Sequence, residues 1–122
     1  MRVIRLPALV LLCIVLTLSG CVSTQPNTPP PSPYQRALIA YVEASIVYEA
    51  AVDMVVAARS GGLISDQQWE MAQRAAENVA GNAPKVRAML AVWKVSGEKP
   101  GDYDAMFSAL LAEIMKLQGV KP

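Results

Sequence analysis

Histidine is missing from this chain, and cysteine is nearly so. None of the 122 residues is histidine, and the two cysteines are Cys13 and Cys21. Without histidine the chain lacks the most common general base and the most common ligand of transition metals. We therefore predict a protein that is not an enzyme, with no cofactor and no metal site.

An excess of charge of either sign is also absent. The 11 basic and 10 acidic side chains give a formal net charge of +1. Binding to nucleic acid needs a basic stripe or patch, which this balance does not supply. We expect no nucleic-acid partner. The length is sufficient for one small domain.

Carboxylates are the remaining candidates for chemistry. Glu43, Glu49 and Asp53 lie close together in the sequence, in a segment with helical periodicity. Helical di-iron proteins combine such glutamates with Glu-x-x-His motifs on partner helices. The lack of histidine rules out that motif here, so the three acidic residues are expected to be solvated.

Only one long apolar run is present, and it lies near the N-terminus. Arg2 and Arg5 are followed by apolar residues from Leu6 to Leu18, and then by the small residues Ser19 and Gly20. This run is shorter than the about 20 residues that a helix needs to cross a bilayer. A basic start, a short apolar run and small residues at the end are typical of a secretory signal peptide. We predict that residues 1–20 are this signal peptide.

The end of the run, Leu18-Ser19-Gly20-Cys21, resembles the lipobox of bacterial lipoproteins. The resemblance implies that Leu18, Ser19 and Gly20 are recognised by the lipoprotein signal peptidase, which cuts before Cys21. It also implies that Cys21 carries a diacylglycerol on its sulfur and an acyl chain, such as palmitate, on its amino group. These chains would anchor the protein in a membrane.

Two further expectations follow from the lipobox. Cys13 leaves with the signal peptide and Cys21 carries lipid, so no disulfide is expected within the chain. In enteric-type lipoproteins an aspartate after the cysteine retains the protein at the inner membrane, whereas this chain has Val22 there. The resemblance therefore implies sorting to the outer membrane and a domain that faces the periplasm.

A proline-rich segment follows Cys21. Residues 22–33 read VSTQPNTPPPSP, with five prolines and no large apolar residue apart from Val22. Such a run favours extended polyproline II and would reach roughly 35 Å. We interpret residues 21–33 as a lipidated cysteine and a disordered tether. The alternatives are a ligand for a proline-binding partner, or the proline-rich stretch that phage outer-membrane spanin subunits carry.

Residues 34–122 are predicted to form an all-α, antiparallel three-helix bundle. Apolar residues recur with helical spacing in three segments, at about 34–60, 66–96 and 102–118. Glycine-containing turns separate the segments, and Gly61 is placed for a left-handed cap at the end of the first helix. These turns predict helices that run back and forth.

Local signals mark where the second and third helices begin. Ser65 and Gln68 have the spacing of a capping box, with Ile64 and Trp69 in the positions of a hydrophobic staple. Asp102 is the predicted cap of the third helix.

The second predicted helix contains Pro84. A proline usually ends or bends a helix, because it lacks an N–H and its ring clashes with the preceding turn. The three-and-four spacing of apolar residues nevertheless continues from Trp69 to Trp93. We predict one helix kinked near Pro84, with two separate helices as the alternative.

The first predicted helix, 34–60, has apolar residues on most of its circumference. A heptad pattern predicts a buried seam at Leu38, Tyr41, Ser45, Tyr48, Val52, Val55 and Arg59. Other large apolar residues lie off that seam and form the predicted interaction surface: Ile39, Val42, Ile46, Val47 and Met54. A helix of this kind needs cover on more than one side, so we expect a second copy of the chain or an envelope protein as partner.

These features predict an envelope lipoprotein whose helical domain is structural or binds a partner. The last 85 residues or so resemble small helical lipoproteins of prophages and mobile elements, on the Gly-Leu-Ile-Ser turn at residues 62–65 followed by Trp69. This resemblance implies two alternatives. One is a protective factor that excludes phage or inhibits a cell-wall hydrolase, and the other is an outer-membrane subunit of a phage lysis complex.

Overall fold

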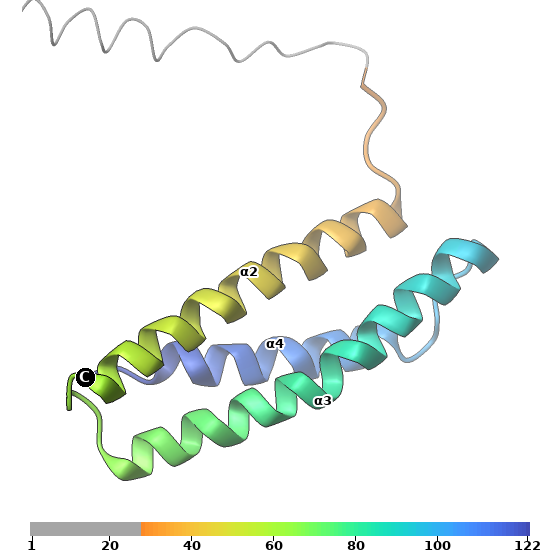
Figure 1. The fold of residues 1–122 in the computed structure, drawn as a ribbon. Helices are drawn as coiled ribbons and strands as arrows, with labels where there is room; N and C mark the ends of the chain where they lie inside the picture. Colours follow the sequence, from red (N-terminus) through yellow and green to blue (C-terminus); the bar gives the residue numbers. More distant parts are fainter. Residues whose placement is uncertain (1–27) are drawn as a thin grey trace, which may run out of the picture. The chain divides into compact units, whose positions relative to one another are not determined.

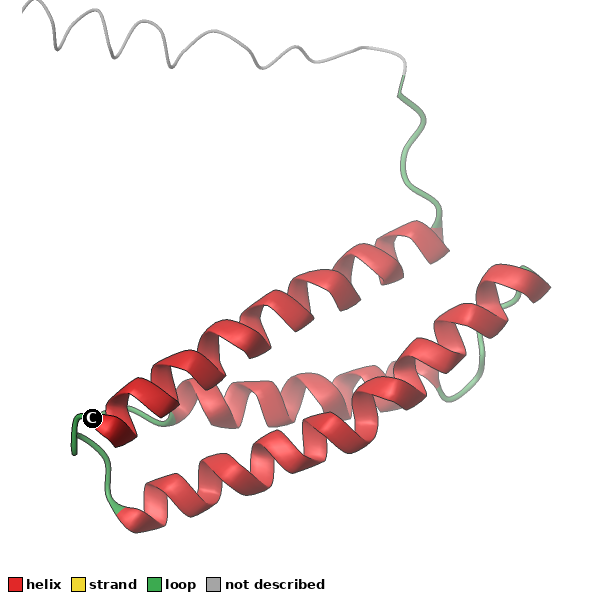
Figure 2. Ribbon diagram, viewed as in Figure 1, coloured by secondary structure: helices red, strands yellow, loops and turns green. Residues whose placement is uncertain are grey.

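The computed structural model describes residues 28–122, and three helices follow one another there (Figures 1 and 2). They are α2 (Pro33–Ser60), α3 (Asp66–Ser96) and α4 (Tyr103–Gly119). Each helix packs against both others, and residues 31–122 form one compact unit. This part of the chain contains no strand, so the predicted all-α three-helix bundle is confirmed.

Helix α2 begins at Pro33, one residue before the predicted start, and its first turn is fixed by a capping box. The Ser32 hydroxyl accepts a hydrogen bond from the Gln35 backbone N–H at 3.1 Å, and Gln35 Oε1 accepts one from the Ser32 N–H at 2.8 Å. Pro33 is tolerated because an N–H in the first turn would have no partner within the helix. The sequence Ser-Pro-x-Gln thus specifies where the proline-rich segment ends and the helix starts.

The turn between α2 and α3 differs from the prediction at one glycine. Gly61 has φ −81°, in the right-handed region, and Gly62 adopts the left-handed conformation with φ 67°. The helix ends at Ser60, as predicted, but Gly61 keeps right-handed angles, so the position that favours glycine is Gly62. The capping box of α3 is confirmed, because the Ser65 hydroxyl accepts from the Gln68 N–H at 3.2 Å.

Helix α3 is continuous through Pro84, as predicted. Pro84 has no N–H to donate to the carbonyl of Ala80, and Ala80 is exposed, so water can take that place. Figure 1 shows the axis of α3 changing direction near the middle of the helix. The bend thus lies at Pro84, beside the exposed residue Ala80, whose carbonyl has lost its partner within the helix.

Asp102 is the N-cap residue of α4, as predicted, but it does not cap the helix with its side chain. Asp102 has helical backbone angles, and its side chain makes no capping hydrogen bond. The backbone N–H of Tyr103 instead donates to the carbonyl of Pro100 at 3.1 Å. Lys99 forms an ion pair with Asp104 across this turn.

The buried residues of α3 and α4 recur with helical spacing. Tyr103, Leu110, Ile114 and Leu117 are all buried on α4. On α3 the buried residues are Ala72, Ala75, Val79, Val86, Leu90 and Trp93.

The predicted seam of α2 is confirmed in part, because Ser45 and Val52 are half-buried but its two ends, Leu38 and Arg59, are exposed. Tyr41 and Val55 are buried and Tyr48 is half-buried, but Leu38 is 39% exposed. The core contains alanines one position earlier than the predicted residues, and these are Ala37, Ala44, Ala51 and Ala58. These alanines pack with buried side chains of α3 and α4, and Leu38 lies outside the buried side of α2.

No helix within residues 28–122 combines the length and the apolar character that crossing a membrane requires.

Candidate functional site

The main candidate site is an exposed apolar surface on α2. We define the outer face of α2 as Leu38, Ile39, Val42, Ile46, Val47 and Met54. It contains all five residues predicted to form an interaction surface, and their exposed fractions range from 38% at Val47 to 72% at Met54. The structure thus leaves the predicted surface uncovered by the bundle.

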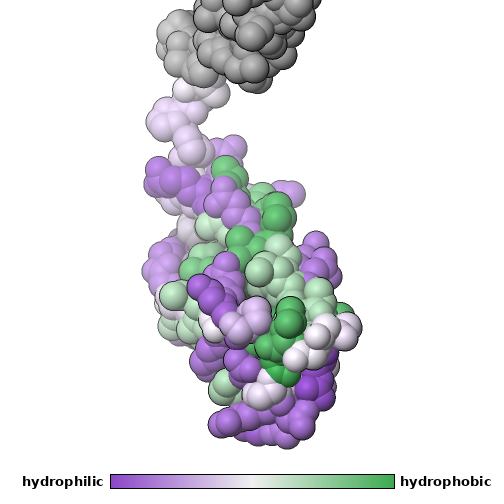
Figure 3. All heavy atoms as spheres, turned by 90° about the vertical axis from the view of Figure 1, so that its left-hand side faces the viewer, coloured by the Kyte–Doolittle hydropathy of each residue, from purple (hydrophilic) through white to green (hydrophobic). Residues whose placement is uncertain are grey.

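Exposed apolar residues are concentrated on this helix. Of the 13 large apolar side chains that are exposed within residues 28–122, seven belong to α2: Leu38, Ile39, Val42, Ile46, Val47, Met54 and Val56. Single exposed apolar residues are normal on any protein, whereas a group on one helix commonly marks a contact surface. Figure 3, which looks at the bundle from the end with the α2–α3 turn, shows apolar side chains reaching the surface among polar ones.

The core explains why this surface is free. α2 contributes small alanines and the tyrosines Tyr34, Tyr41 and Tyr48 to the bundle. The Tyr41 hydroxyl donates to the carbonyl of Ala83 at 3.5 Å and accepts from Arg87 at 3.5 Å. Since these residues already fill the side towards α3 and α4, the branched side chains of α2 remain on the solvent side.

The central stripe on the solvent side of α2 is apolar in the first half of the helix and acidic in the second half. Ile39, Val42 and Ile46 alternate by three and four residues, which places them in one stripe along the helix. The next two positions of the same stripe are Glu49 and Asp53, and both are exposed. The continuous apolar stripe is therefore limited to the half of α2 that follows the proline-rich segment, and Met54 lies off it in the second half.

Opposite charges lie along one edge of the apolar half. Arg36 and Glu43 are exposed, and the ion pairs found within residues 28–122 include neither of them. They are separated by seven residues, or about 10 Å along the helix axis, so they lie on the same side but too far apart to pair. The pairing of these two charges was not predicted from the sequence, although opposite charges at heptad spacing beside an apolar stripe are typical of helix–helix contacts.

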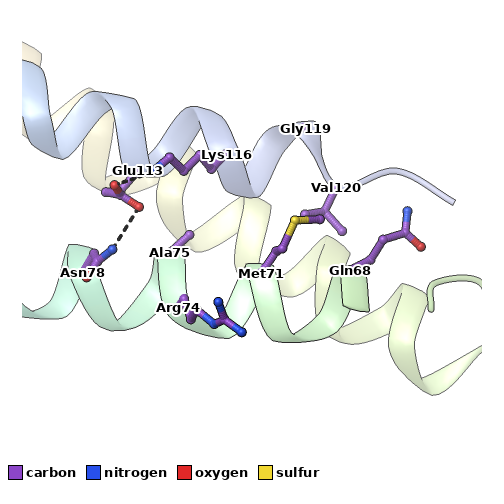
Figure 4. Close-up of a pocket in the computed structure, with 9 residues that line it drawn as sticks. All are labelled: Gln68, Met71, Arg74, Ala75, Asn78, Glu113, Lys116, Gly119 and Val120. Atoms are coloured by element: carbon purple, nitrogen blue, oxygen red, sulfur yellow. Dashed lines mark hydrogen bonds and ion pairs between the residues drawn. The ribbon is translucent and has the colours of Figure 1, made fainter. Parts of the chain in front are cut away.

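A second candidate site is a groove of about 450 Å³ between α3 and α4 (Figure 4). Met71, Ala75 and Val120 supply its apolar lining, and Arg74 and Lys116 lie among its polar residues. Figure 4 shows Met71 extending from α3 towards Val120, which follows α4. The sequence analysis did not predict this groove, because it arises only when the two helices are side by side.

Polar groups in this groove are engaged with one another. Glu113 accepts hydrogen bonds from Lys116 Nζ at 2.6 Å and from Asn78 Nδ2 at 3.2 Å. These two contacts, with Lys116 first, lower the pKa of the Glu113 carboxyl below its ordinary value. Arg74 pairs with Glu70 at 3.4 Å. The hydrogen bond between Asn78 and Glu113 thus connects α3 to α4 across the groove. We assign no ligand to the groove.

Aromatic side chains connect the start of α2 with the other two helices. The ring of Trp93 lies 6.0 Å from Tyr34 and 5.5 Å from Tyr103, both edge to face, and Tyr103 stacks on Phe107 at 5.7 Å. The Tyr103 hydroxyl donates to the carbonyl of Ala37 at 3.4 Å. Burial, and then the nearby Asp104, raise the pKa of Tyr103. This cluster holds the first half of α2, and with it the apolar part of the outer face.

The lipobox residues Leu18, Ser19, Gly20 and Cys21 lie outside the described residues. Within residues 28–122, no three Cys, Asp or Glu side chains are grouped so that they could hold a metal ion. Glu43, Glu49 and Asp53 are exposed on α2.

Comparisons of the chain with family models, curated proteins and solved structures found no match.

Proposed function

We propose that this protein is a lipid-anchored component of the bacterial envelope whose helical bundle acts by binding, through the outer face of α2. The anchor is Cys21, the domain faces the periplasm, and the membrane is the outer membrane. The observation that carries the proposal is the position of the apolar surface. Ile39, Val42 and Ile46 lie on the first helix after the proline-rich segment and are 50%, 49% and 61% exposed.

The arrangement suits binding close to a membrane. Two or three acyl chains on Cys21 give stable anchoring, whereas one chain gives only marginal binding. The capping box at Ser32 fixes the residue at which the helix begins. The outer face of α2 would then be presented within a few tens of ångströms of the lipid surface.

The anchor is tested by replacing the cysteine that carries it. We expect Cys21→Ser to shift the protein from the membrane fraction to the soluble or uncleaved precursor fraction, because the thioether can no longer form. Cys13→Ser is the matched control, since it changes a cysteine inside the predicted signal peptide and should leave the mature protein lipidated. Fractionation, with separation of inner and outer membranes on a density gradient, measures both.

Two results would contradict this proposal. If the Cys21→Ser protein is processed and remains as firmly in membranes as the unaltered protein, the lipid anchor is wrong. If the unaltered protein is found in the inner-membrane fraction, the anchor stands and the outer-membrane location is wrong.

A further inference from the structure

We propose that the first half of the outer face of α2 binds the same face of a second copy of this chain, with the two helices antiparallel. This inference deepens the proposed function by naming the partner, and it rests on the binding part of that proposal but not on the anchor. It is carried by the order of charged and apolar residues along α2.

The parallel arrangement is disfavoured by the acidic half of the helix. In a parallel pair in register, each residue of the stripe lies opposite its own copy. Glu49 and Asp53 continue the stripe beyond Ile46. Each would therefore face the identical acidic residue of the partner, and like charges in such positions repel.

An antiparallel pair avoids this repulsion when its two-fold axis passes between Ala40 and Tyr41. Ile39 then lies opposite the partner's Val42, and Val42 opposite the partner's Ile39. Glu49 lies opposite the partner's Ser32, where the partner's helix has not yet begun. The overlap extends from Pro33 to Tyr48, about 24 Å at 1.5 Å per residue.

The same axis brings opposite charges together. Residues on one edge of a helix meet the same edge of the partner in an antiparallel pair. Arg36 therefore approaches the partner's Glu43, and Glu43 approaches the partner's Arg36. A change of register by one heptad, which moves the axis by about half a heptad towards the C-terminus, would instead place Ile39 opposite the partner's Glu49, so the charge pattern selects one register.

The contact is small, and we expect a weak dimer in solution. An overlap of this length buries less than the about 800 Å² per partner of a standard interface, so we expect a dissociation constant on the order of 10–100 µM. Anchoring of both copies in one membrane would raise their effective concentration. Because the two-fold axis can lie perpendicular to the membrane, both proline-rich segments can reach the same surface.

Charge reversal and charge exchange test the register. The chain from Val22 onward retains the compact unit of residues 31–122 and lacks the lipid, and its association can be measured by sedimentation equilibrium up to about 500 µM. We expect Arg36→Glu and Glu43→Arg each to weaken the dimer about tenfold, because each places like charges in both symmetry-related pairs. The double variant Arg36→Glu/Glu43→Arg should return to within about twofold of the unaltered chain. Ile39→Glu should abolish detectable association.

Lys85→Glu is the matched control, since Lys85 is exposed on α3 and its reversal changes the net charge by the same amount as Arg36→Glu. Thermal unfolding followed by circular dichroism confirms that each variant is folded. A chain that remains monomeric at about 500 µM would overturn the proposal, as would an Arg36→Glu effect no larger than that of Lys85→Glu.

Two more outcomes would also overturn it. A double variant as weak as the single variants would exclude this register. Cosedimentation of a monomeric chain with neutral phosphatidylcholine vesicles would assign the outer face to lipid instead. Neither outcome depends on Cys21, whose role is decided by the fractionation described above.

Discussion

The two ends of the bundle are held together by different kinds of side chain. At the end where α2 starts, Trp93 contacts the rings of Tyr34 and Tyr103. At the end with the α2–α3 turn, the buried core consists of small and aliphatic residues: Ala51, Val55, Ile64, Ala72, Ala75 and Leu117. Trp69 is only half-buried against this core. Large rings gain stability from their buried area, whereas alanines allow helix backbones to approach closely. Replacing a large side chain by a smaller one should therefore destabilise the fold most at the first end. Replacing an alanine by a larger residue should destabilise it at the second end.

Removing the central ring of the aromatic end should have the largest effect. We expect Trp93→Ala to lower the free energy of unfolding by about 3–5 kcal/mol, because it leaves a cavity and ends both edge-to-face contacts. Leu117→Ala, at the other end, should cost about 2–5 kcal/mol and less than Trp93→Ala. Urea unfolding of both variants measures the difference. If Leu117→Ala costs more, the aromatic end is not the principal contributor to stability.

Enlarging an alanine of the other end should have an intermediate effect. Ala51 is 6% exposed and faces the core, while its neighbour Ala50 is exposed. Ala51→Leu should destabilise the fold by about 1–3 kcal/mol through overpacking. Ala50→Leu, the matched control, should change stability by less than about 0.5 kcal/mol. Equal effects at the two positions would contradict the close approach of α2 at Ala51.

The smallest expected effect concerns pH and Glu113, which lies between the two ends on α4. Its lowered pKa means that the folded chain binds this proton less readily than the unfolded chain. The stability that it contributes is present above about pH 5 and is lost as the pH falls through the folded pKa. Glu113→Gln should therefore reduce the rise in stability between about pH 3 and pH 6.

Glu77→Gln is the control for this measurement, because Glu77 is an exposed carboxylate on α3. It should leave the pH dependence closer to that of the unaltered chain. If the two variants show the same pH dependence, the hydrogen bonds from Lys116 and Asn78 to Glu113 do not persist in solution.

Helices α3 and α4 could be predicted nearly completely, because their apolar residues form narrow stripes. The spacing from Trp69 to Trp93 was sufficient to predict one helix across Pro84, and the structure confirms it. Predicted bounds agree within one residue for all three helices. Where one face alone is apolar, periodicity identifies the buried side directly.

The buried side of α2 could not be predicted in this way. Its apolar residues surround the helix, so periodicity does not distinguish Leu38 from Ala37. The choice is made by tertiary packing, since the core around Trp93 and Leu110 takes alanines and tyrosines of α2 and not Leu38. The exposed surface at Ile39, Val42 and Ile46 was nevertheless predicted, because more apolar residues were present than one core could bury.

The position of the capping box at Ser32 has a mechanical consequence. Under tension, a force applied through the proline-rich segment enters the folded domain at Ser32 and passes first into the opening turns of α2. Ile39, Val42 and Ile46 lie within the next four turns or so. A load between the anchor and a partner on this face would thus pass through a short stretch of a single helix. The core formed by α3 and α4 would lie outside the path of the force.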